Sequence, residues 1–545
     1  MYIFSANAHK KMDRVLEEIL SIEISEDVYK HLMPHQIPHL QNLIYSIRKN
    51  GVALDSGDTG SGKSYTVIAL CAVMGLRPFF NGLKGGIPNL YKVCEIFGIE
   101  PIGNINYESI KNGKYYESLE DYQSENRVEC PYVEVVKVHD KDPISGKLKY
   151  DKNGKAKMIV QKFIWKLPEN TIVVFDEAHK CKNGKTSGQN TTNSKFMASI
   201  KPYISKEKNI YCILLSATIT DKLENFDVVA YILGLYRPYQ SKIYKQFLRN
   251  HGRDEKEIFQ SIHKLLFPVY ASRMSIKAIK EDTGNSVFRT NDVKAVIFPV
   301  DKQTSIEIEE NHQMIKRALK EIRSKGLSKG WGIIIRYWQR IEVLKVPSVV
   351  DTIIQNLQDS AVVVFINFSE TKKLLVDHLT AKGVNIQRMD FIDGEQKADE
   401  RENVVDRFQN NNVDLLICQI KAGGVSLSLH DLHGKQRKSL IFPTWSATDI
   451  KQSLGRIYRA NAKTDAIQRI VYCKCTDEQA NSELDRQIHL RDESVSEEYT
   501  NVAGECNGVL TIEEKLCQNV NVKLENIEMI NNGNLDGFQN IDEIN

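Results

Sequence analysis

Short runs of consecutive apolar residues recur along the first half of the chain, and each run ends in polar residues. They occupy 52–54, 172–175 and 210–215. Apolar runs without alternation are typical of strands that are buried on both faces of a parallel sheet. Residues 37–48 and 65–74 have the apolar spacing or length of helices. The pattern therefore predicts strands that alternate with helices, and hence an α/β domain.

The same alternation returns in the second half of the chain. The predicted strands are 361–366, 413–419, 439–442 and 466–472, and helices are predicted at 372–382 and 400–410. Strands that alternate with helices are connected by crossovers, which make neighbouring strands parallel. The second half therefore predicts a second parallel sheet in a domain of its own.

The segments outside the predicted sheets have different patterns. Residues 132–167 alternate apolar and polar positions and contain turn signals such as Asn153-Gly154, which predicts an inserted β-meander. The glycine-rich residues 80–88 are expected to form a loop. The region between the two sheets is expected to be mostly helical, with 303–325 as a helix.

These patterns divide the chain into five segments. We expect an N-terminal helical segment at 1–25, a first α/β domain at 26–230 with its β insertion at about 130–168, a helical insertion at 231–345, a second α/β domain at 346–480, and an acidic, asparagine-rich tail at 481–545. The tail contains one short predicted helix, near 511–516, and the rest of it is expected to be partly disordered.

Charge and cysteine usage narrow the class of protein. The net charge is +3, but residues from 481 on contain 4 Lys and Arg against 14 Asp and Glu, so residues 1–480 carry +13. A basic body is compatible with a polyanionic partner, although a diffuse excess is often only a solvated surface. The ten cysteines form no C-x-x-C pair, so we expect reduced thiols and no zinc. Without a signal pattern or a spanning apolar run, we expect a soluble intracellular protein, with no membrane as partner.

The stretch from Gly57 to Ser64 reads G-D-T-G-S-G-K-S and matches the phosphate-loop pattern G-x-x-x-x-G-K-[ST]. Gly57, Gly60 and Gly62 allow a tight turn whose N–H groups can surround phosphate oxygens. Lys63 adds a positive charge, and Ser64 offers a hydroxyl to Mg²⁺. A glycine-rich turn is the structural alternative, but the strand before the stretch and the helix after it favour binding of ATP with Mg²⁺.

Two further polar clusters follow predicted strands. Asp176 and Glu177 end the 172–175 run, where a carboxylate can hold Mg²⁺ through water and its neighbour can orient and deprotonate an attacking water. Ser216 and Thr218 end the 210–215 run and could hydrogen-bond toward His179, which would report the nucleotide state; a Ser/Thr turn is the alternative. Ahead of the loop, Gln36 could read adenine through its amide, or could be a surface glutamine.

In this order the motifs resemble motifs I, II and III of the superfamily-2 helicases and translocases of the DEAH type, with Gln36 similar to their adenine-reading glutamine. The second half agrees with that resemblance. Residues 361–369 resemble motif IV, 421–429 resemble motif V of the Swi/Snf-like translocases, and 452–459 resemble motif VI. The sequences around 345–347 and 443–447 are also similar to helicase-like proteins of large DNA viruses.

The resemblance implies a fold and a set of site residues. It implies two tandem RecA-like domains, with catalytic roles for Glu177, Gln452 and the two arginine fingers Arg456 and Arg459, which would act on ATP in a cleft between the domains. The nucleic-acid contacts that it implies are Asn367, Ser369, Lys421, Gly423 and Gly424. Motif Ia departs from the family pattern, because 79–88 is glycine-rich where the family has a strand that leads to a backbone-gripping residue.

The function implied is that of a nucleic-acid-dependent ATP hydrolase, a helicase or translocase that acts on DNA by preference, with an RNA helicase as the alternative. A nucleotide switch without motor activity and a silent nucleic-acid-binding scaffold are less favoured, because the residues of motifs I, II and VI are all present. The basic and aromatic stretch from Arg336 to Arg340 could stack on a nucleic acid, or could be part of an amphipathic helix. The oligomeric state is left open.

Overall fold

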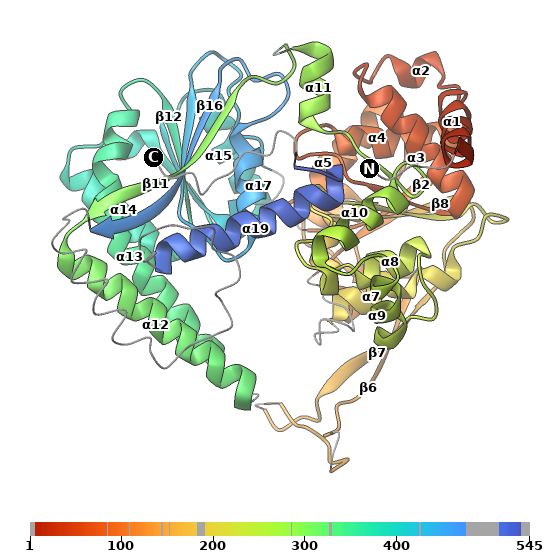
Figure 1. Cartoon of the computed structure of the whole chain (residues 1–545), viewed down its shortest axis with the longest axis horizontal. Helices are drawn as coiled ribbons and strands as arrows, with labels where there is room; N and C mark the ends of the chain where they lie inside the picture. The colour runs from red at the N-terminus through yellow and green to blue at the C-terminus, as the bar shows by residue number, and fades with distance from the viewer. Residues whose placement is uncertain are drawn as a thin grey trace. The chain divides into compact units, whose positions relative to one another are not determined.

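The computed structural model describes residues 6–83, 85–107, 109–142, 145–151, 153–182, 191–284, 286–325, 330–423, 427–475 and 512–535. The chain forms two compact units, each with its own sheet (Figure 1). Among the described residues, the first unit contains those up to Gly284 and those from Glu525 to Leu535. The second unit contains the described residues from Ser286 to Leu524.

The first unit is built on a six-stranded sheet in the order β10-β1-β9-β8-β2-β3, and every pair in it is parallel. Its strands are β1 (Val52–Asp55), β2 (Arg77–Gly82), β3 (Gly103–Asn106), β8 (Thr171–Asp176), β9 (Ile210–Leu215) and β10 (Ala271–Ser272). In a parallel sheet all carboxyl ends lie at one edge, which is the usual position of a ligand site. Polar residues that follow these strands are thereby collected at that edge.

Helices cover both faces of this sheet. The helices of the unit are α1 (Ala6–Leu20), α2 (Glu26–Tyr29), α3 (Gln36–Asn50), α4 (Lys63–Met74), α5 (Ile87–Phe97), α6 (Leu119–Gln123), α7 (Thr192–Ser199), α8 (Asp227–Leu233), α9 (Ser241–Arg249), α10 (Glu255–Leu266) and α11 (Ile276–Thr283). Successive strand residues point to opposite faces, so Ala53 packs in the core under α3 and α4, whereas Val52 and Leu54 pack in the core that includes α8 and α10. This two-sided burial explains the uninterrupted apolar runs.

Two small antiparallel sheets belong to the same unit. One joins β4 (Lys114–Tyr115) to β5 (Val128–Glu129), and the other joins β6 (Val133–His139) to β7 (Met158–Trp165). The segment expected to be a β-meander is therefore a long hairpin at its base, and antiparallel bridges from Lys141 to Leu148 and from Tyr150 to Ala156 form a small meander at its tip.

The glycine-rich segment 80–88 differs from the loop expected there. Strand β2 extends to Gly82, and α5 begins at Ile87 with Pro88 in its first turn, so the connection is short. Phe79 and Phe80 are fully buried on opposite faces of the sheet, and their burial outweighs the weak strand preference of the following asparagine and glycine. A Cβ at residue 82 would make a tight contact, 3.3 Å from Cβ of Asp176.

The region expected to be a helical insertion, 231–345, is divided between the units. Its helices α8 to α10 precede β10, which is an edge strand of the first sheet, and α11 follows it; β11 (Asn291–Val300) pairs with β16 at the edge of the second sheet. Strand β10 has two residues, too few for any periodicity in the sequence. The helical expectation is right for α12 (Lys302–Lys325) and for the start of α13 (Gly330–Asn356).

The second sheet also has six strands, all parallel, in the order β11-β16-β15-β12-β14-β13. Besides β11 these are β12 (Ala361–Ile366), β13 (Met389–Ile392), β14 (Leu415–Gln419), β15 (Arg437–Ile441) and β16 (Ala466–Cys475). The helices that follow the strands are α14 (Ser369–Ala381), α15 (Ala398–Gln409), α16 (Ile420–Gly423) and α17 (Ala447–Ile457). The α/β fold with two parallel sheets, predicted from the two sets of apolar runs, is confirmed.

The acidic tail contains more structure than the short helix expected near 511–516. Helix α19 (Ile512–Asn532) has 21 residues, and its part from Glu525 on belongs to the first unit. Ile527 and Ile530 are fully buried, and Met529 and Ile530 are members of the first unit's core. The polar composition concealed this helix, although most of its apolar residues with described side chains are buried; they are Cys517, Val520, Leu524, Ile527, Met529 and Ile530, whereas Val522 is exposed.

Candidate functional site

The phosphate loop connects β1 to α4 at the carboxyl edge of the first sheet. Gly60 and Gly62 have φ values of +84° and +98°, which residues with a side chain rarely adopt. A Cβ on Gly62 would lie 2.0 Å from Nε2 of Gln36, so any side chain there would displace the Gln36 amide from its place against the loop. Lys63 begins α4, and its Nζ donates to the carbonyl oxygens of Gly57 at 2.8 Å and Asp58 at 3.0 Å. The lysine charge is thus held over the loop.

Gln36 lies directly against this loop. Its Nε2 donates to the Ser61 carbonyl oxygen at 3.4 Å, and its Oε1 accepts from the Met33 N–H at 2.8 Å. The side chain is buried at the start of α3. A surface position is therefore excluded, and a contact with adenine stays a prediction.

The buried carboxylate of Asp55 holds the start of the loop by a hydrogen bond. Oδ1 of Asp55 accepts from the Gly57 N–H at 2.9 Å and lies 3.1 Å from Nε2 of His39, and Oδ2 accepts from the Thr66 hydroxyl at 3.3 Å. Burial alone would raise the pKa of Asp55, but the charge and hydrogen bond of His39, with smaller effects of Lys63 and the Gly57 N–H, hold it below its ordinary value. Nδ1 of His39 lies 2.7 Å from the Ser272 hydroxyl, so the network reaches β10.

The loop is also held from the side by Arg273, directly after β10. Its Nη2 donates to Oδ1 of Asp58 at 2.8 Å, and its Nη1 donates to the Ser56 carbonyl oxygen. The backbone adds the Asp58 N–H to the Met274 carbonyl, and the Ile276 N–H to Oδ2 of Asp58, both at 3.0 Å. We name this set of contacts the Arg273 clamp. It was not expected from the sequence, because nothing near Arg273 in the chain marks it.

The second half of α19 joins the same edge of the sheet. Nε of Arg273 donates to Oδ1 of Asn532 at 2.9 Å, and Nδ2 of Asn531 donates to the Ala217 carbonyl oxygen at 2.9 Å. Ala217 lies between Ser216 and Thr218, so the tail contacts the segment that resembles motif III. Asn531 is fully buried. The end of the chain is thereby connected to both the phosphate loop and the end of β9.

Asp176 and Glu177 follow β8 at this edge. The Tyr107 hydroxyl donates to the Asp176 carbonyl oxygen at 2.8 Å, and Glu177 has a φ of +52°. Such a conformation is costly for a glutamate and is typical of positions where side-chain direction has a function. Oε2 of Glu177 lies 3.2 Å from Nδ1 of His179. Nδ2 of Asn89, from α5, donates to the Ser64 hydroxyl at 3.2 Å and was not predicted.

His179 lies between the Glu177 carboxylate and the end of β9. Its Nδ1 is 3.2 Å from the Ser216 hydroxyl, and this hydroxyl also donates to the Thr218 carbonyl oxygen at 2.9 Å. Burial lowers the pKa of His179, although the hydrogen bond and charge of Glu177 act in the opposite direction. The ring is therefore neutral near pH 7. Ser216 contacts His179 directly, whereas Thr218 contributes backbone groups to Ser216.

In the second unit, Asn367 follows β12 and is bound to a buried glutamate. Its N–H and its Nδ2 donate to the Glu342 carboxylate at 2.9 and 2.6 Å, and the Thr371 hydroxyl donates to it at 2.6 Å. The Ser369 hydroxyl accepts from Nε2 of Gln419 at 2.8 Å. Asn367 and Ser369, two of the residues predicted to contact nucleic acid, are thus held in place by neighbouring residues. Their side chains take part in these hydrogen bonds.

The segment that resembles motif V follows β14, the parallel neighbour of β12. Lys421 is exposed in α16, and Gly423 is the last residue of that helix. Gly424 lies outside the described residues. The residues after β12 and β14 therefore lie at the same edge of the second sheet, as expected of a common binding surface.

The segment that resembles motif VI lies on and just after α17. Nη1 of Arg456 donates to the Leu427 carbonyl oxygen at 3.4 Å, and Nη2 of Arg459 donates to the same oxygen at 2.8 Å. Arg456 and Gln452 are buried, and Arg459 is half-buried. The two arginines are therefore anchored together on the loop after α16.

Comparison with known proteins identifies the family. Residues 345–461 match the helicase conserved C-terminal domain. A protein of Acanthamoeba polyphaga mimivirus named "Putative ATP-dependent RNA helicase L364" is 31% identical over 543 residues, which cover 95% of this chain and 86% of that protein. The chain belongs to the helicases. It is therefore an ATP hydrolase, and the resemblance inferred from the motifs is confirmed.

Other proteins are similar to this helicase over a shorter stretch of sequence, or in structure at low sequence identity. Protein CHROMATIN REMODELING 24 of Arabidopsis thaliana is 33% identical over 104 residues, 18% of the helicase and 9% of that protein. The Sulfolobus solfataricus SWI2/SNF2 ATPase core in complex with dsDNA is 14% identical, with coverage of 87% and 95% of the two chains and a TM-score of 0.33. S. cerevisiae Dbp5 bound to RNA and ADP BeF3 is 10% identical, with coverage of 89% and 94% and a TM-score of 0.43.

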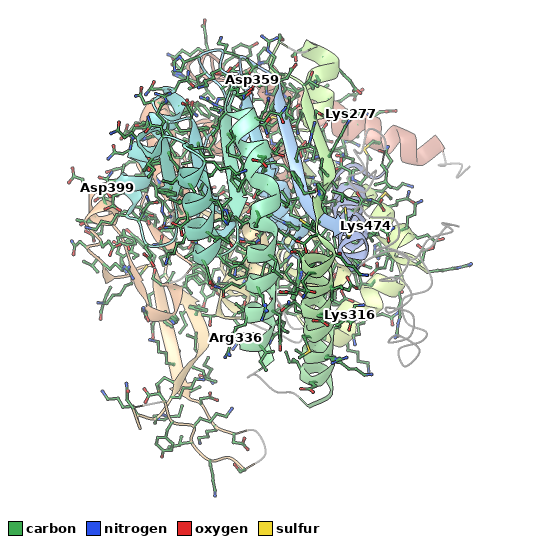
Figure 2. All side chains as sticks on the ribbon, turned by 90° about the vertical axis from the view of Figure 1, so that its left-hand side faces the viewer. Lys277, Lys316, Arg336, Asp359, Asp399 and Lys474 are labelled. Atoms are coloured by element: carbon green, nitrogen blue, oxygen red, sulfur yellow. The ribbon has the colours of Figure 1, made fainter. Side chains whose placement is uncertain are left out.

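The basic and aromatic stretch from Arg336 to Arg340 lies on α13, and its tryptophan packs inside the second unit. Trp338 stacks on Trp445, with ring centroids 5.3 Å apart and an angle of 11° between the planes, and also packs edge-on against Phe368. Arg336, labelled in Figure 2, is exposed. The amphipathic-helix interpretation thus accounts for the tryptophan. Among the described residues, no helix is long and apolar enough to cross a membrane.

Proposed function

We propose that this helicase couples ATP hydrolysis to translocation on DNA, with strand separation as an optional outcome. The observation that carries the choice of DNA is the segment 421–429, which resembles the Swi/Snf-like motif V. Lys421 is exposed at the carboxyl edge of the second sheet, where a phosphate backbone could be bound without base contacts. The local similarity to a chromatin-remodelling protein supports the same choice.

ATP and Mg²⁺ fit the residues at the carboxyl edge of the first sheet. The loop has the left-handed glycines and the lysine that a triphosphate needs, and Ser64 and Asp176 are oxygen ligands of the kind that Mg²⁺ prefers. We propose that these two residues hold the ion, which when bound would neutralise phosphate charge. Asn89 would orient the Ser64 hydroxyl.

The chain's own residues would then divide the chemistry. Lys63 binds the phosphates, and Glu177, held in a strained conformation, orients the attacking water and accepts its proton. His179 connects Glu177 to Ser216 and thereby to the segment that resembles motif III. Arg456 and Arg459 supply positive charge that stabilises the transition state, as arginine fingers do in related triphosphatases.

The second candidate is an ATP-dependent RNA helicase, favoured by the name of the mimivirus relative. Two assays distinguish the candidates: displacement of a triplex-forming strand from duplex DNA, and unwinding of a tailed RNA duplex. Triplex displacement is expected for the DNA translocase. RNA unwinding without triplex displacement would refute the DNA proposal and establish the second candidate.

A matched pair of variants tests the role of motif V. Lys421→Ala is expected to weaken stimulation of ATP hydrolysis by duplex DNA. Lys382→Ala is the control, because Lys382 is exposed at the end of α14, at the opposite edge of the same sheet. Equal effects of the two substitutions would contradict a specific contact by Lys421.

A further inference from the structure

The β6–β7 hairpin has a rigid root in the core of the first unit. Val133, Phe163 and Trp165 are buried there, and the Trp165 ring stacks on Phe196 with centroids 4.8 Å apart. Nε1 of Trp165 donates to the Ser199 hydroxyl at 2.8 Å. The orientation of the hairpin at its base is therefore fixed by packing and not only by its own ladder.

Beyond the root the hairpin extends away from the sheet of its unit (Figure 1). Its paired register runs from Val133 opposite Trp165 to His139 opposite Met158. The tip is a small antiparallel meander in which Lys149 N–H donates to the Asp140 carbonyl and Lys157 N–H to the Lys149 carbonyl, both at 2.8 Å. The described part of the tip is thus hydrogen-bonded and can present side chains at fixed positions.

This projecting segment is strongly basic. Residues 133–166 contain nine lysines against four acidic residues, a net charge of +5. Two lysines, Lys149 and Lys157, lie within 4 Å of the Asp140 carboxylate, and Lys166 lies 2.8 Å from Glu134. The remaining lysines of the described hairpin are exposed and make no ion pair with a described residue; they are Lys137, Lys141, Lys147, Lys155 and Lys162.

The hairpin also exposes apolar groups beside the charges. Tyr150 at the tip is 61% exposed, and Met158 is 46% exposed. Like charges crowded on one thin hairpin repel one another, so this composition costs stability unless a polyanion neutralises it. A flat aromatic ring among lysines suits a nucleic acid, since the charges bind phosphates and the ring can pack on a base or sugar.

We propose that residues 133–166, the basic arm, form a second nucleic-acid contact of this helicase, directed at the phosphate backbone. The inference rests on the proposed function, because it concerns the same polymer. It adds a contact from the first unit, where the glycine-rich segment 79–88 gives no clear gripping residue. Because the arm binds charge and not base edges, it does not depend on sequence.

The test uses the full chain with Lys147→Gln and Lys155→Gln together. The matched control is Lys206→Gln with Lys208→Gln, which removes the same charge just before β9, at the amino edge of the first sheet. Binding of a fluorescent DNA duplex is measured as a function of salt concentration, alongside ATP hydrolysis without nucleic acid. Both double variants are expected to keep the basal rate.

The arm variant is expected to bind duplex DNA at least about tenfold more weakly at 0.1 M salt. The slope of log K against log salt should become shallower by about 0.9 for each phosphate that the arm no longer neutralises. Tyr150→Ala should weaken binding and Tyr150→Phe should not, because the ring is kept. An arm variant with the same slope as the control would overturn the proposal and would leave the arm to a protein partner. Failure of the unsubstituted helicase to bind any nucleic acid would instead refute the proposed function.

Discussion

The contacts of the Arg273 clamp predict how much stability and ATP affinity the protein loses when Arg273 is replaced. The side chains of Arg273 and Asp58 are only 11% and 15% exposed, and the guanidinium bonds to the Asp58 carboxylate, the Ser56 carbonyl and Asn532. Replacing Arg273 by methionine keeps most of the volume and removes all three bonds. The Asp58 carboxylate then keeps its charge in a largely buried place without the guanidinium beside it.

Removing one partner of a buried ion pair lowers the free energy of unfolding by about 3–5 kcal/mol. Because this pair is partly exposed, we expect Arg273→Met to lower it by about 3 kcal/mol. Because Asp58 belongs to the phosphate loop, loss of the guanidinium beside its carboxylate should also weaken ATP binding about tenfold, or about 1.4 kcal/mol. Asp58→Asn alone should cost about 2 kcal/mol of stability. The double variant removes both charges, so its loss should be smaller than the sum of the two.

The double-mutant cycle is measured by urea unfolding and by titration with ATP. We expect a coupling energy of about 2 kcal/mol, and recovery of ATP affinity in the double variant. Lys277→Met is the control: Lys277, labelled in Figure 2, lies on α11 close in sequence to Arg273, and its side chain is 51% exposed. Its effect should lie within about 0.5 kcal/mol. Additive losses from Arg273→Met and Asp58→Asn, within about 0.5 kcal/mol, would refute the clamp.

Three further expectations concern the two units. Lys63→Ala should abolish hydrolysis and weaken ATP binding, whereas Glu177→Gln should keep binding and stop hydrolysis; equal loss of binding in both would contradict this division. Arg456→Ala and Arg459→Ala should each leave ATP binding largely unchanged and reduce hydrolysis about 10³-fold, as measured by steady-state rates. Burial raises the pKa of Glu342 above 4.5 despite its hydrogen bonds, so the folded protein retains this proton at a higher pH than the unfolded chain does. Stability should therefore fall as pH rises from 4.5 to the raised value, and Glu342→Gln should remove that part of the pH dependence in urea unfolding.

The residues that act through local backbone geometry could be recognised in the sequence. A phosphate loop needs its glycines and lysine at fixed spacing, and Asp176 follows directly from an apolar strand, so the sequence alone indicates both. Arg273 lies 215 positions from Asp58, and only the two-residue strand β10 brings it there. For Asn367 the motif predicts a nucleic-acid contact, which stays a prediction, whereas the bond of its amide to Glu342, 25 positions earlier, was not indicated by the sequence. Contacts between distant segments leave no local pattern.

The position of Met529 and Ile530 in the core of the first unit has a consequence for synthesis of the protein. The sheet of that unit begins at Val52, so the ribosome must continue from there to Ile530 before this core can be completed. At about 5–20 residues per second, the delay is roughly half a minute to a minute and a half. During that interval the nascent ATPase unit lacks the helix that covers part of its core. A chain terminated before Glu525 would contain each of the motifs yet lack Asn531 and Ile530, so translation through α19 determines when the unit matures.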